Sequence, residues 1–332
     1  MSESTLVVGA YGYGNAGDEA ILAGLLSRHD RGKMTVVSRT PRKTAAAHGV
    51  RTVGIGRAVS ALLTHRSVII GGGGVFGRDM GPTGRLLPAF GLLATALRRR
   101  VSVEGVDLDT RLSPSARVLV PALLRACETV TLRDQASAAI ARGWGVAAEV
   151  IPDLSSWMPP AAPETGRHLL ERAGLATDRP IVGLSLTGVN EDLANYVIEA
   201  TIRTIHAMPG ARFVFVPMSR HPHVAAHDDV LFARRLARSA PLTILEEPRP
   251  PGEILAVFAH LSAVVAMRYH AMLFAARCGT PLIPIPYAEK THRWLAEHGR
   301  RGVPPVAETL TSALRAALEG VPAGRPNLEV AS

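Results

Sequence analysis

Side chains suited to binding and protonating a small anion follow two short apolar runs in the second half of the chain. Arg268 and His270 come after the run Ala263–Met267, and Lys290 comes after the run Pro281–Tyr287. Short apolar runs of this kind predict buried strands, and open α/β sheets bind ligands outside the carboxyl ends of their strands. Arginine and lysine bind carboxylates and phosphates, whereas histidine exchanges protons near neutral pH. The pattern therefore predicts a site for a doubly anionic substrate with an acid or base beside it.

The arginine and the histidine of this segment are predicted to act together. Residues two apart on a strand point to the same side, so we expect Arg268 and His270 to share one face. An arginine beside an apolar run needs a partner that compensates the cost of desolvation. The structural alternative makes Arg268 half of a buried ion pair and His270 a capping histidine before the predicted helix Ala271–Arg277. Lys290, expected in the next loop, has the alternative of a solvated surface lysine.

A glycine-rich loop near the N-terminus is a second candidate site. It lies between a predicted strand, Thr5–Ala10, and a predicted helix, Ala20–Ser27. Glycines let the backbone approach a ligand closely, and the N-terminus of a helix attracts an anion. Asn15 and Asp18 are therefore candidate substrate ligands in this loop.

The same loop leaves two alternatives open. Its glycine spacing, GxGxxG from position 12, formally matches a dinucleotide-binding fingerprint. The acidic residue expected about 20 positions later is missing, but Arg39, at the end of the predicted strand Met34–Arg39, would suit the 2′-phosphate of NADP. The plainer alternative is a tight strand-to-helix turn that places Asp18 near a helix N-terminus.

A run of four glycines, Gly71–Gly74, directly follows another predicted strand, Val68–Ile70. A plain turn does not need four glycines, which cost backbone entropy, so we expect a ligand or another backbone to approach closely here. Arg78 and Asp79 lie in the loop that follows and are candidate site residues. The alternative is that they form a solvated pair on the surface. The candidate substrate contacts of this segment are Gly72, Gly73, Gly74 and Arg78.

Predicted strands and helices alternate along the whole chain, which indicates parallel sheets covered by helices. The alternation is interrupted where Pro159, Pro160 and Pro163 cluster. We therefore predict an N-terminal domain over residues 1–158, a linker region over 159–179, a C-terminal domain over 180–323 and a tail over 324–332. The predicted fold class is α/β, with two doubly wound, Rossmann-like domains that face a cleft, the architecture of many nucleotide-sugar transferases.

Composition limits the class of partner. The chain of 332 residues carries a formal net charge of +9, which favours anionic ligands or an anionic membrane surface. The charges are scattered and aromatic residues do not alternate with them, so we expect no nucleic acid partner. The arginines 98–100 close a predicted helix, where cations are favourable, and a peripheral contact with the inner membrane face is the alternative explanation.

The remaining polar residues predict neither a metal site nor a disulfide. The segment 221–229 contains three histidines and two aspartates, but its spacing is not a metal signature and favours a polar loop. Cys127 and Cys278 are far apart and are expected to be buried thiols in a reducing compartment. The first residues lead directly into a strand, without the basic region of a signal peptide, and no apolar run is long enough to span a bilayer. We therefore expect a cytoplasmic protein, with membrane association left open.

Several motifs together resemble the polysaccharide pyruvyltransferase family and extend over nearly the whole chain. The motifs are GNAGDE from Gly14, GGGGVF from Gly71, VTLRDQAS from Val130, MRYHAM from Met267 and PYAEK from Pro286. The resemblance implies a fold similar to the two-domain glycosyltransferase B type. It also implies transfer of a pyruvyl group from phosphoenolpyruvate to two hydroxyls of a sugar, which forms a cyclic ketal.

The resemblance implies a role for each matching side chain. Arg133 and Arg268 look like ligands of the donor carboxylate or phosphate, His270 like the catalytic acid or base, and Lys290 like a further phosphate contact. Phosphoenolpyruvate is the donor substrate, and no metal or other cofactor is expected. This chain differs from the usual family pattern at residues 104–109, where EGVDLD replaces a glycine-rich element, and at residues 288–289.

The leading hypothesis is thus a pyruvyltransferase that acts on a sugar or lipid-linked glycan of a cell-wall or exopolysaccharide precursor. One alternative is a nucleotide-sugar glycosyltransferase of the same architecture, which needs a pocket for a base and ribose in its C-terminal domain. A second is an NADP-dependent oxidoreductase that uses the N-terminal loop with Arg39. A third is a non-catalytic binding protein that keeps the fold. The oligomeric state is left unassigned.

Overall fold

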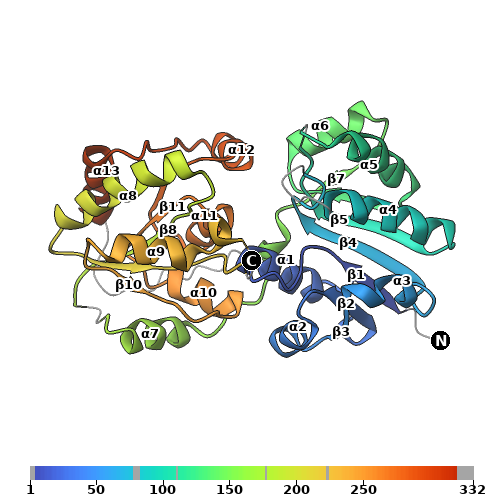
Figure 1. Cartoon of the computed structure of the whole chain (residues 1–332), viewed down its shortest axis with the longest axis horizontal. Helices are drawn as coiled ribbons and strands as arrows, with labels where there is room; N and C mark the ends of the chain where they lie inside the picture. The colour runs from blue at the N-terminus through green and yellow to red at the C-terminus, as the bar shows by residue number, and fades with distance from the viewer. Residues whose placement is uncertain (1–3, 78–82, 110, 176–177, 222–223, 320–332) are drawn as a thin grey trace. The chain divides into compact units, whose positions relative to one another are not determined.

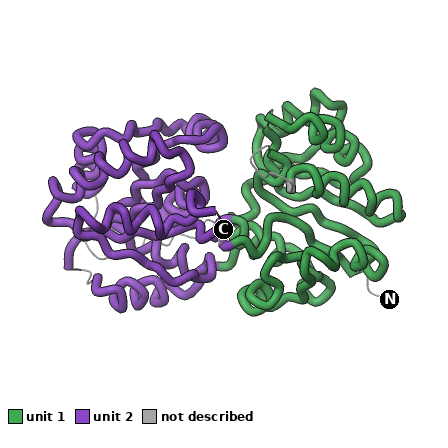
Figure 2. Tube along the Cα trace, in the orientation of Figure 1, with its two compact units in different colours: residues 1–13, 18–159 green, residues 14–17, 160–332 purple. Residues whose placement is uncertain are grey.

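The computed structural model describes residues 4–77, 83–109, 111–175, 178–221 and 224–319. The chain divides into two compact units, shown in separate colours in Figure 2. Unit 1 comprises residues 1–13 and 18–159, and unit 2 comprises residues 14–17 and 160–332. The short segment 14–17 therefore leaves unit 1 and packs as part of unit 2. The division near residue 159 falls in the proline-rich segment.

Unit 1 is a seven-stranded parallel sheet with helices on both faces (Figure 1). The strand order is β3-β2-β1-β4-β5-β6-β7. Its strands are β1 (Thr5–Val8), β2 (Met34–Ser38), β3 (Arg51–Gly54), β4 (Ser67–Gly73), β5 (Arg100–Val106), β6 (Thr129–Leu132) and β7 (Glu149–Val150). Its helices are α1 (Ala16–Ser27), α2 (Pro41–His48), α3 (Ala58–Ala61), α4 (Thr83–Ala96), α5 (Pro114–Ala126) and α6 (Gln135–Gly143).

Alternation along the strands of unit 1 supplies two separate hydrophobic cores. Leu6 and Val8 of β1 pack with buried residues of α3, α4, α5 and α6. Val7, on the opposite side of the same strand, packs with the apolar stripe of α1 and with Leu154. Strands buried on both faces read as continuous apolar runs, and such runs predicted β1, β2 and β4 from the sequence.

Unit 2 is a five-stranded parallel sheet with the strand order β10-β9-β8-β11-β12. Its strands are β8 (Ile181–Ser185), β9 (Arg212–Phe215), β10 (Thr243–Ile244), β11 (Ala263–Ala266) and β12 (Leu282–Pro284). Its helices are α7 (Pro163–Arg172), α8 (Glu191–His206), α9 (Asp229–Ala237), α10 (Pro251–Phe258), α11 (Tyr269–Arg277), α12 (Glu289–Glu297) and α13 (Ala307–Glu319). Helices α8, α9 and α13 share one hydrophobic core, and Phe258 of α10 contacts Phe274 of α11.

The segment expected to be a linker contains a helix of unit 2. Pro163 begins α7, a position that tolerates proline because the missing N–H has no partner in a helix anyway. Leu169 and Leu170 of α7 are buried, and the helix packs on α10. Prolines at a helix start and prolines in a linker look alike in the sequence, so the helix was missed.

The strand order of each sheet reverses at one point. Several candidate residues lie directly after the strands that flank these reversal points. In unit 1 the reversal separates β1 from β4, and in unit 2 it separates β8 from β11. Open α/β sheets bind ligands outside the carboxyl ends of the strands at such a point. The loop beginning at Gly12 follows β1, the run Gly71–Gly74 ends β4, and Arg268 follows β11.

Two predicted placements are wrong in their local structure. β11 ends at Ala266, Arg268 caps α11, and His270 is the second residue of that helix, so strand alternation does not relate the two side chains. Lys290 is the second residue of α12 and not part of a loop. Over the described residues, no helix combines the length and the apolar character needed to span a membrane.

Candidate functional site

The guanidinium group of Arg268 is held by a buried carboxylate from another helix. Its Nε donates hydrogen bonds to Oδ1 and Oδ2 of Asp229, each at 3.1 Å, and its Nη2 donates to Oδ1. The Asp229 side chain is 0% exposed, and that of Arg268 is 13% exposed. Two-point pairing of this kind fixes the direction of the guanidinium plane as well as its charge.

Asp229 also organises the loop after β9. Its Oδ2 accepts hydrogen bonds from the backbone N–H groups of Met218 and Ser219, each at 3.0 Å. Burial alone would lower the pKa of Arg268, but Asp229 and the hydroxyl of Tyr287 outweigh it and raise that pKa above its ordinary value. Arg268 therefore stays charged, and its charge is compensated within unit 2.

His270 lies against the N-terminal loop. A Cβ atom at Gly17 would stand 2.0 Å from Nδ1 of His270, so only glycine allows this contact. The loop is fixed by backbone hydrogen bonds from Arg220 to Gly14 and from Ala16 to Met218, each at 2.8 Å. The segment 14–17 thus forms a wall beside the imidazole.

Lys290 approaches the same group of residues through an aromatic ring. Its Nζ lies 6.0 Å from the centroid of the Tyr269 ring, at the limit of a cation–π contact. The rings of Tyr269 and His270 are neighbours at 5.3 Å, edge to face. Arg268, His270 and Lys290 therefore lie around Tyr269 at the carboxyl edge of the unit 2 sheet.

Arg133 lies in unit 1, in a buried cluster of its own. Its Nη2 is 2.8 Å from Oδ2 of Asp107, and its Nη1 is 3.4 Å from Oδ2 of Asp153. All three side chains are less than a tenth exposed. Asp107 belongs to the segment 104–109, so this segment supplies a partner for Arg133. Binding of a donor by Arg133 stays a prediction.

The N-terminal candidates are partly explained by local structure. Oδ1 of Asn15 accepts a hydrogen bond from the Gly17 N–H at 2.9 Å, which caps the start of α1. Asp18 lies in the first turn of α1, where a carboxylate is favourable. Glu19 accepts a hydrogen bond from the Gly12 N–H at 2.8 Å and pairs with Nε2 of His48 at 2.6 Å.

The glycine run at the end of β4 makes room for side chains. A Cβ at Gly71 would stand 2.4 Å from the Tyr11 hydroxyl, and one at Gly72 would stand 2.3 Å from Cγ2 of Ile21. Gly73 has a φ of 79°, which favours glycine without any neighbour. Packing alone therefore requires much of this run. The predicted substrate contacts of Gly72, Gly73 and Gly74 stay predictions, and Arg78 lies outside the described residues.

Sequence reasoning missed Asp229, the carboxylate that positions Arg268. From the sequence, Asp229 is only one residue of an expected polar loop, although Arg268 is expected to need a partner. The two residues of that pair are far apart in the sequence, and no spacing rule connects them. Among the described residues, no group of three or more His, Cys, Asp or Glu side chains is arranged to hold a metal ion.

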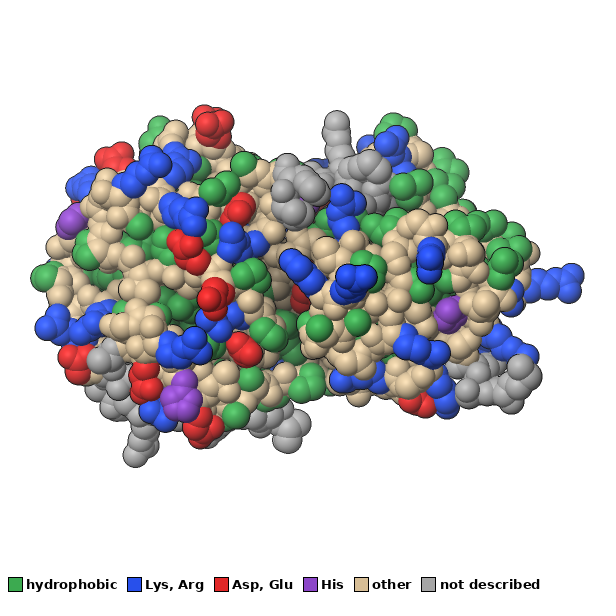
Figure 3. Space-filling view, turned by 60° about the horizontal axis from the view of Figure 1, so that its bottom comes forward, with side chains coloured by type: hydrophobic (Ala, Val, Ile, Leu, Met, Phe, Trp, Pro, Cys, Tyr) green, Lys and Arg blue, Asp and Glu red, His purple; other side chains and the backbone are tan. Residues whose placement is uncertain are grey.

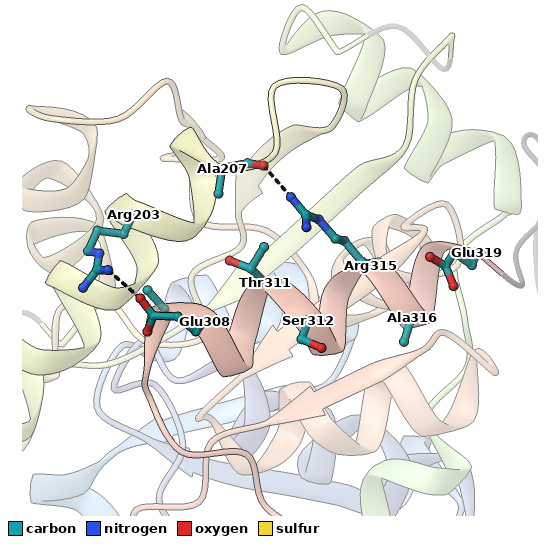
Figure 4. A pocket seen from close by; sticks show the side chains of 9 residues that line it. Arg203, Ala207, Glu308, Thr311, Ser312, Arg315, Ala316 and Glu319 are labelled. Carbon is teal, nitrogen blue, oxygen red and sulfur yellow. Dashed lines mark hydrogen bonds and ion pairs between the residues drawn. The ribbon is translucent and has the colours of Figure 1, made fainter.

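A groove of about 620 Å³ lies between α8 and α13 of unit 2 (Figure 4). Arg203 pairs there with Glu308, and Arg315 donates a hydrogen bond to the Ala207 carbonyl. None of the predicted site residues lines this groove. Its arginines are already held by Glu308 and by the Ala207 carbonyl, so the groove does not replace the carboxyl edge as the candidate site.

Solved structures confirm the predicted fold class of two parallel-sheet α/β domains. The chain is similar to HepE from Anabaena in complex with UDP-glucose, with 15% identity, a TM-score of 0.65, and coverage of 95% of this chain and 90% of that one. It is also similar to UDP-GlcNAc 2-epimerase from Neisseria meningitidis bound to UDP-GlcNAc, with 11% identity and a TM-score of 0.68. That match covers 96% of this chain and 92% of the epimerase chain. Likeness at such identity shows the fold alone.

A third similar structure is sucrose-phosphate synthase from Thermosynechococcus elongatus, with 13% identity, a TM-score of 0.54, and coverage of 96% of this chain and 90% of that one. A search of curated proteins finds no match. The sequence model of the family described as polysaccharide pyruvyl transferase matches residues 15–289. That range contains three of the five motifs in full and all of the other two except Gly14 and Lys290, and the chain belongs to the polysaccharide pyruvyl transferase family.

Proposed function

We propose that this protein transfers a pyruvyl group from phosphoenolpyruvate to two hydroxyls of a sugar in a cell-wall or exopolysaccharide precursor. The observation that carries the proposal is the grouping of Arg268, His270 and Lys290 at the carboxyl edge of unit 2, in a chain of this family. Phosphoenolpyruvate carries a carboxylate and a phosphate, and these cations suit both groups.

The reaction requires one proton on carbon and the loss of phosphate. The methylene carbon of the donor gains a proton and becomes a methyl group, while a sugar hydroxyl oxygen bonds to the neighbouring carbon. The bond from that carbon to the phosphate oxygen then breaks, and a second hydroxyl closes the ketal. Of the two hydroxyl protons, one balances the proton on the methyl group and the other leaves with phosphate. His270 can supply and accept these protons, and Lys290 can stabilise the departing phosphate.

The paired state of Arg268 refines its proposed role. Asp229 takes the Nε edge of the guanidinium, so Arg268 acts as a fixed directional donor and not as an isolated charge. The fixed orientation lowers the reorganisation needed when the donor binds, because the arginine does not have to be ordered at that moment.

Thermal unfolding with and without ligand tests donor binding. We expect millimolar phosphoenolpyruvate to raise the melting temperature of the wild-type protein and not that of Arg268→Ala, each compared with its own ligand-free state. Arg235→Ala is the matched control, because Arg235 is exposed and its Nη2 donates a hydrogen bond to the side chain of Asn195. No stabilisation of the wild type would contradict the proposal.

A nucleotide-sugar glycosyltransferase is the second candidate, because HepE and the epimerase with the same fold are bound to UDP-sugars. UDP-glucose in the same thermal assay separates the two candidates. Stabilisation by UDP-glucose, with none by phosphoenolpyruvate, would favour the glycosyltransferase.

A further inference from the structure

The outer surface of one helical layer in unit 1 is both apolar and basic. Helices α3, α4, α5 and α6 cover the same core of the sheet. The sequence over residues 55–66, 83–100 and 112–127, which contains α3, α4 and α5, has no aspartate or glutamate. Figure 3 shows Lys or Arg side chains and hydrophobic side chains next to one another over unit 1, on the right of the view.

Helix α4 is apolar on its solvent side as well as on its buried side. Leu86 is 66% exposed, and Leu93 and Leu97 are each 40% exposed. Leu97 follows the last residue of α4, and its N–H still donates to the Leu93 carbonyl at 3.0 Å. The spacings of seven and four place the three leucines on one stripe. Pro88 and Gly91 lie on the opposite, buried side.

The same helical layer carries further exposed apolar residues. Val118 of α5 is 70% exposed, and α5 packs directly on α4. On α3 and the turn after it, Val59 is 58% exposed and Leu63 is 69% exposed. Single exposed leucines are ordinary, but these residues are gathered on one layer that lacks acidic residues.

Arginines accompany the exposed apolar residues. We define the basic apolar face as Val59, Leu63, Leu86, Leu93, Leu97 and Val118 together with the exposed Arg57, Arg66, Arg85, Arg98, Arg117 and Arg125. Arg85 and Arg98 lie at the two ends of the leucine stripe. An apolar strip with basic residues around it is the composition of a surface that lies in the interface of a membrane.

We propose that the basic apolar face binds the surface of a bilayer that contains anionic phospholipid. The leucines of α4 enter the boundary between headgroups and acyl chains, and the arginines contact lipid phosphates. Charge decides between this partner and a second copy of the chain. A two-fold interface would place the same arginines opposite one another, whereas anionic headgroups complement them.

Vesicle flotation of the full chain tests this proposal. The vesicles consist of phosphatidylcholine alone or of phosphatidylcholine mixed with phosphatidylglycerol. We expect binding to the mixed vesicles only, weakened but not abolished at high salt. Leu86→Gln/Leu93→Gln should lower the affinity by about tenfold or more. Arg98→Gln and Arg117→Gln should each lower it about fivefold.

The matched control is Leu231→Gln/Tyr196→Gln, which removes apolar residues of unit 2 that are 45% and 68% exposed. It should bind the mixed vesicles as the wild type does, and all variants should keep the wild-type melting temperature because the changed side chains are exposed. Absence of binding to the mixed vesicles overturns the proposal, as does binding that the leucine changes leave intact. A dimer in solution that Leu86→Gln/Leu93→Gln dissociates would also overturn it, because the face would then be a contact between copies.

Discussion

Replacing Asp229 with asparagine should destabilise unit 2 far more than its conservative shape suggests. The substitution keeps an oxygen that can accept the N–H groups of Met218 and Ser219, but it leaves the Arg268 charge without its partner. Breaking a buried ion pair from one side costs about 3–5 kcal/mol. Because the two backbone hydrogen bonds can survive, we expect the lower end, about 3 kcal/mol.

Urea unfolding and scanning calorimetry measure this loss. In a domain of the size of unit 2, each 1 kcal/mol lost from the free energy of unfolding lowers the melting temperature by roughly 2–4 °C. The melting temperature of unit 2 should therefore fall by about 10 °C. Asp228→Asn is the matched control. Asp228 caps α9 by accepting from the Val230 N–H at 2.9 Å, and asparagine caps helices as well as aspartate does.

A second substitution distinguishes an unpaired charge from a packing defect. Arg268→Met in the Asp229→Asn background removes the orphaned guanidinium and should recover about 2 kcal/mol, because an apolar replacement of a buried pair is often neutral. The reasoning is refuted if Asp229→Asn unfolds within about 0.5 kcal/mol of the wild type. It is also refuted if the double variant is no more stable than Asp229→Asn alone.

Three further predictions follow from the described contacts. Arg133→Met should destabilise unit 1 by about 3 kcal/mol or more in urea, because it leaves two buried carboxylates without their cation; wild-type stability would contradict the ion-pair cluster. Burial raises the pKa of the Cys278 thiol to about 12, so this thiol should resist a disulfide reagent at pH 8 until the chain unfolds. Rapid labelling of Cys278 in the native protein would contradict this prediction. Gly17→Ala should displace His270 and slow phosphate release by more than about tenfold. Gly56→Ala is the control and should not slow it, because a Cβ at Gly56 meets no atom within 4 Å. Equal rates of phosphate release in the two variants would disprove the contact of Gly17 with His270.

Much of the fold was readable from the sequence because buried parallel strands appear as continuous apolar runs. The runs that became β1, β4 and β11 were recognised in this way, and glycines follow β1 and end β4 at the reversal point of the unit 1 sheet. The half-exposed strand β3 lacks such a run, since it begins with an exposed arginine and ends in glycine, and it was not predicted. Helix α7 was missed because its prolines also suit a linker.

The candidate site was predictable where one segment carries it and not where distant segments meet. Arg268 and His270 lie two positions apart, and their place after an apolar run was visible. The pairing of Arg268 with Asp229 and the contact of His270 with Gly17 join residues that no local pattern connects. Long-range packing of this kind appears only in three dimensions. That the two domains face a cleft stays a prediction.

The most direct test of the central claim is mass spectrometry of a lipid-linked or free sugar acceptor after incubation with the protein and phosphoenolpyruvate. The account predicts a product heavier by one pyruvyl ketal, one phosphate released per product, and neither with His270→Ala, which should still be stabilised by the donor. Product formation at the wild-type rate by His270→Ala would contradict the assigned acid or base. Failure of the wild type to modify any sugar of an acceptor panel, with phosphoenolpyruvate left intact, would contradict the claim itself.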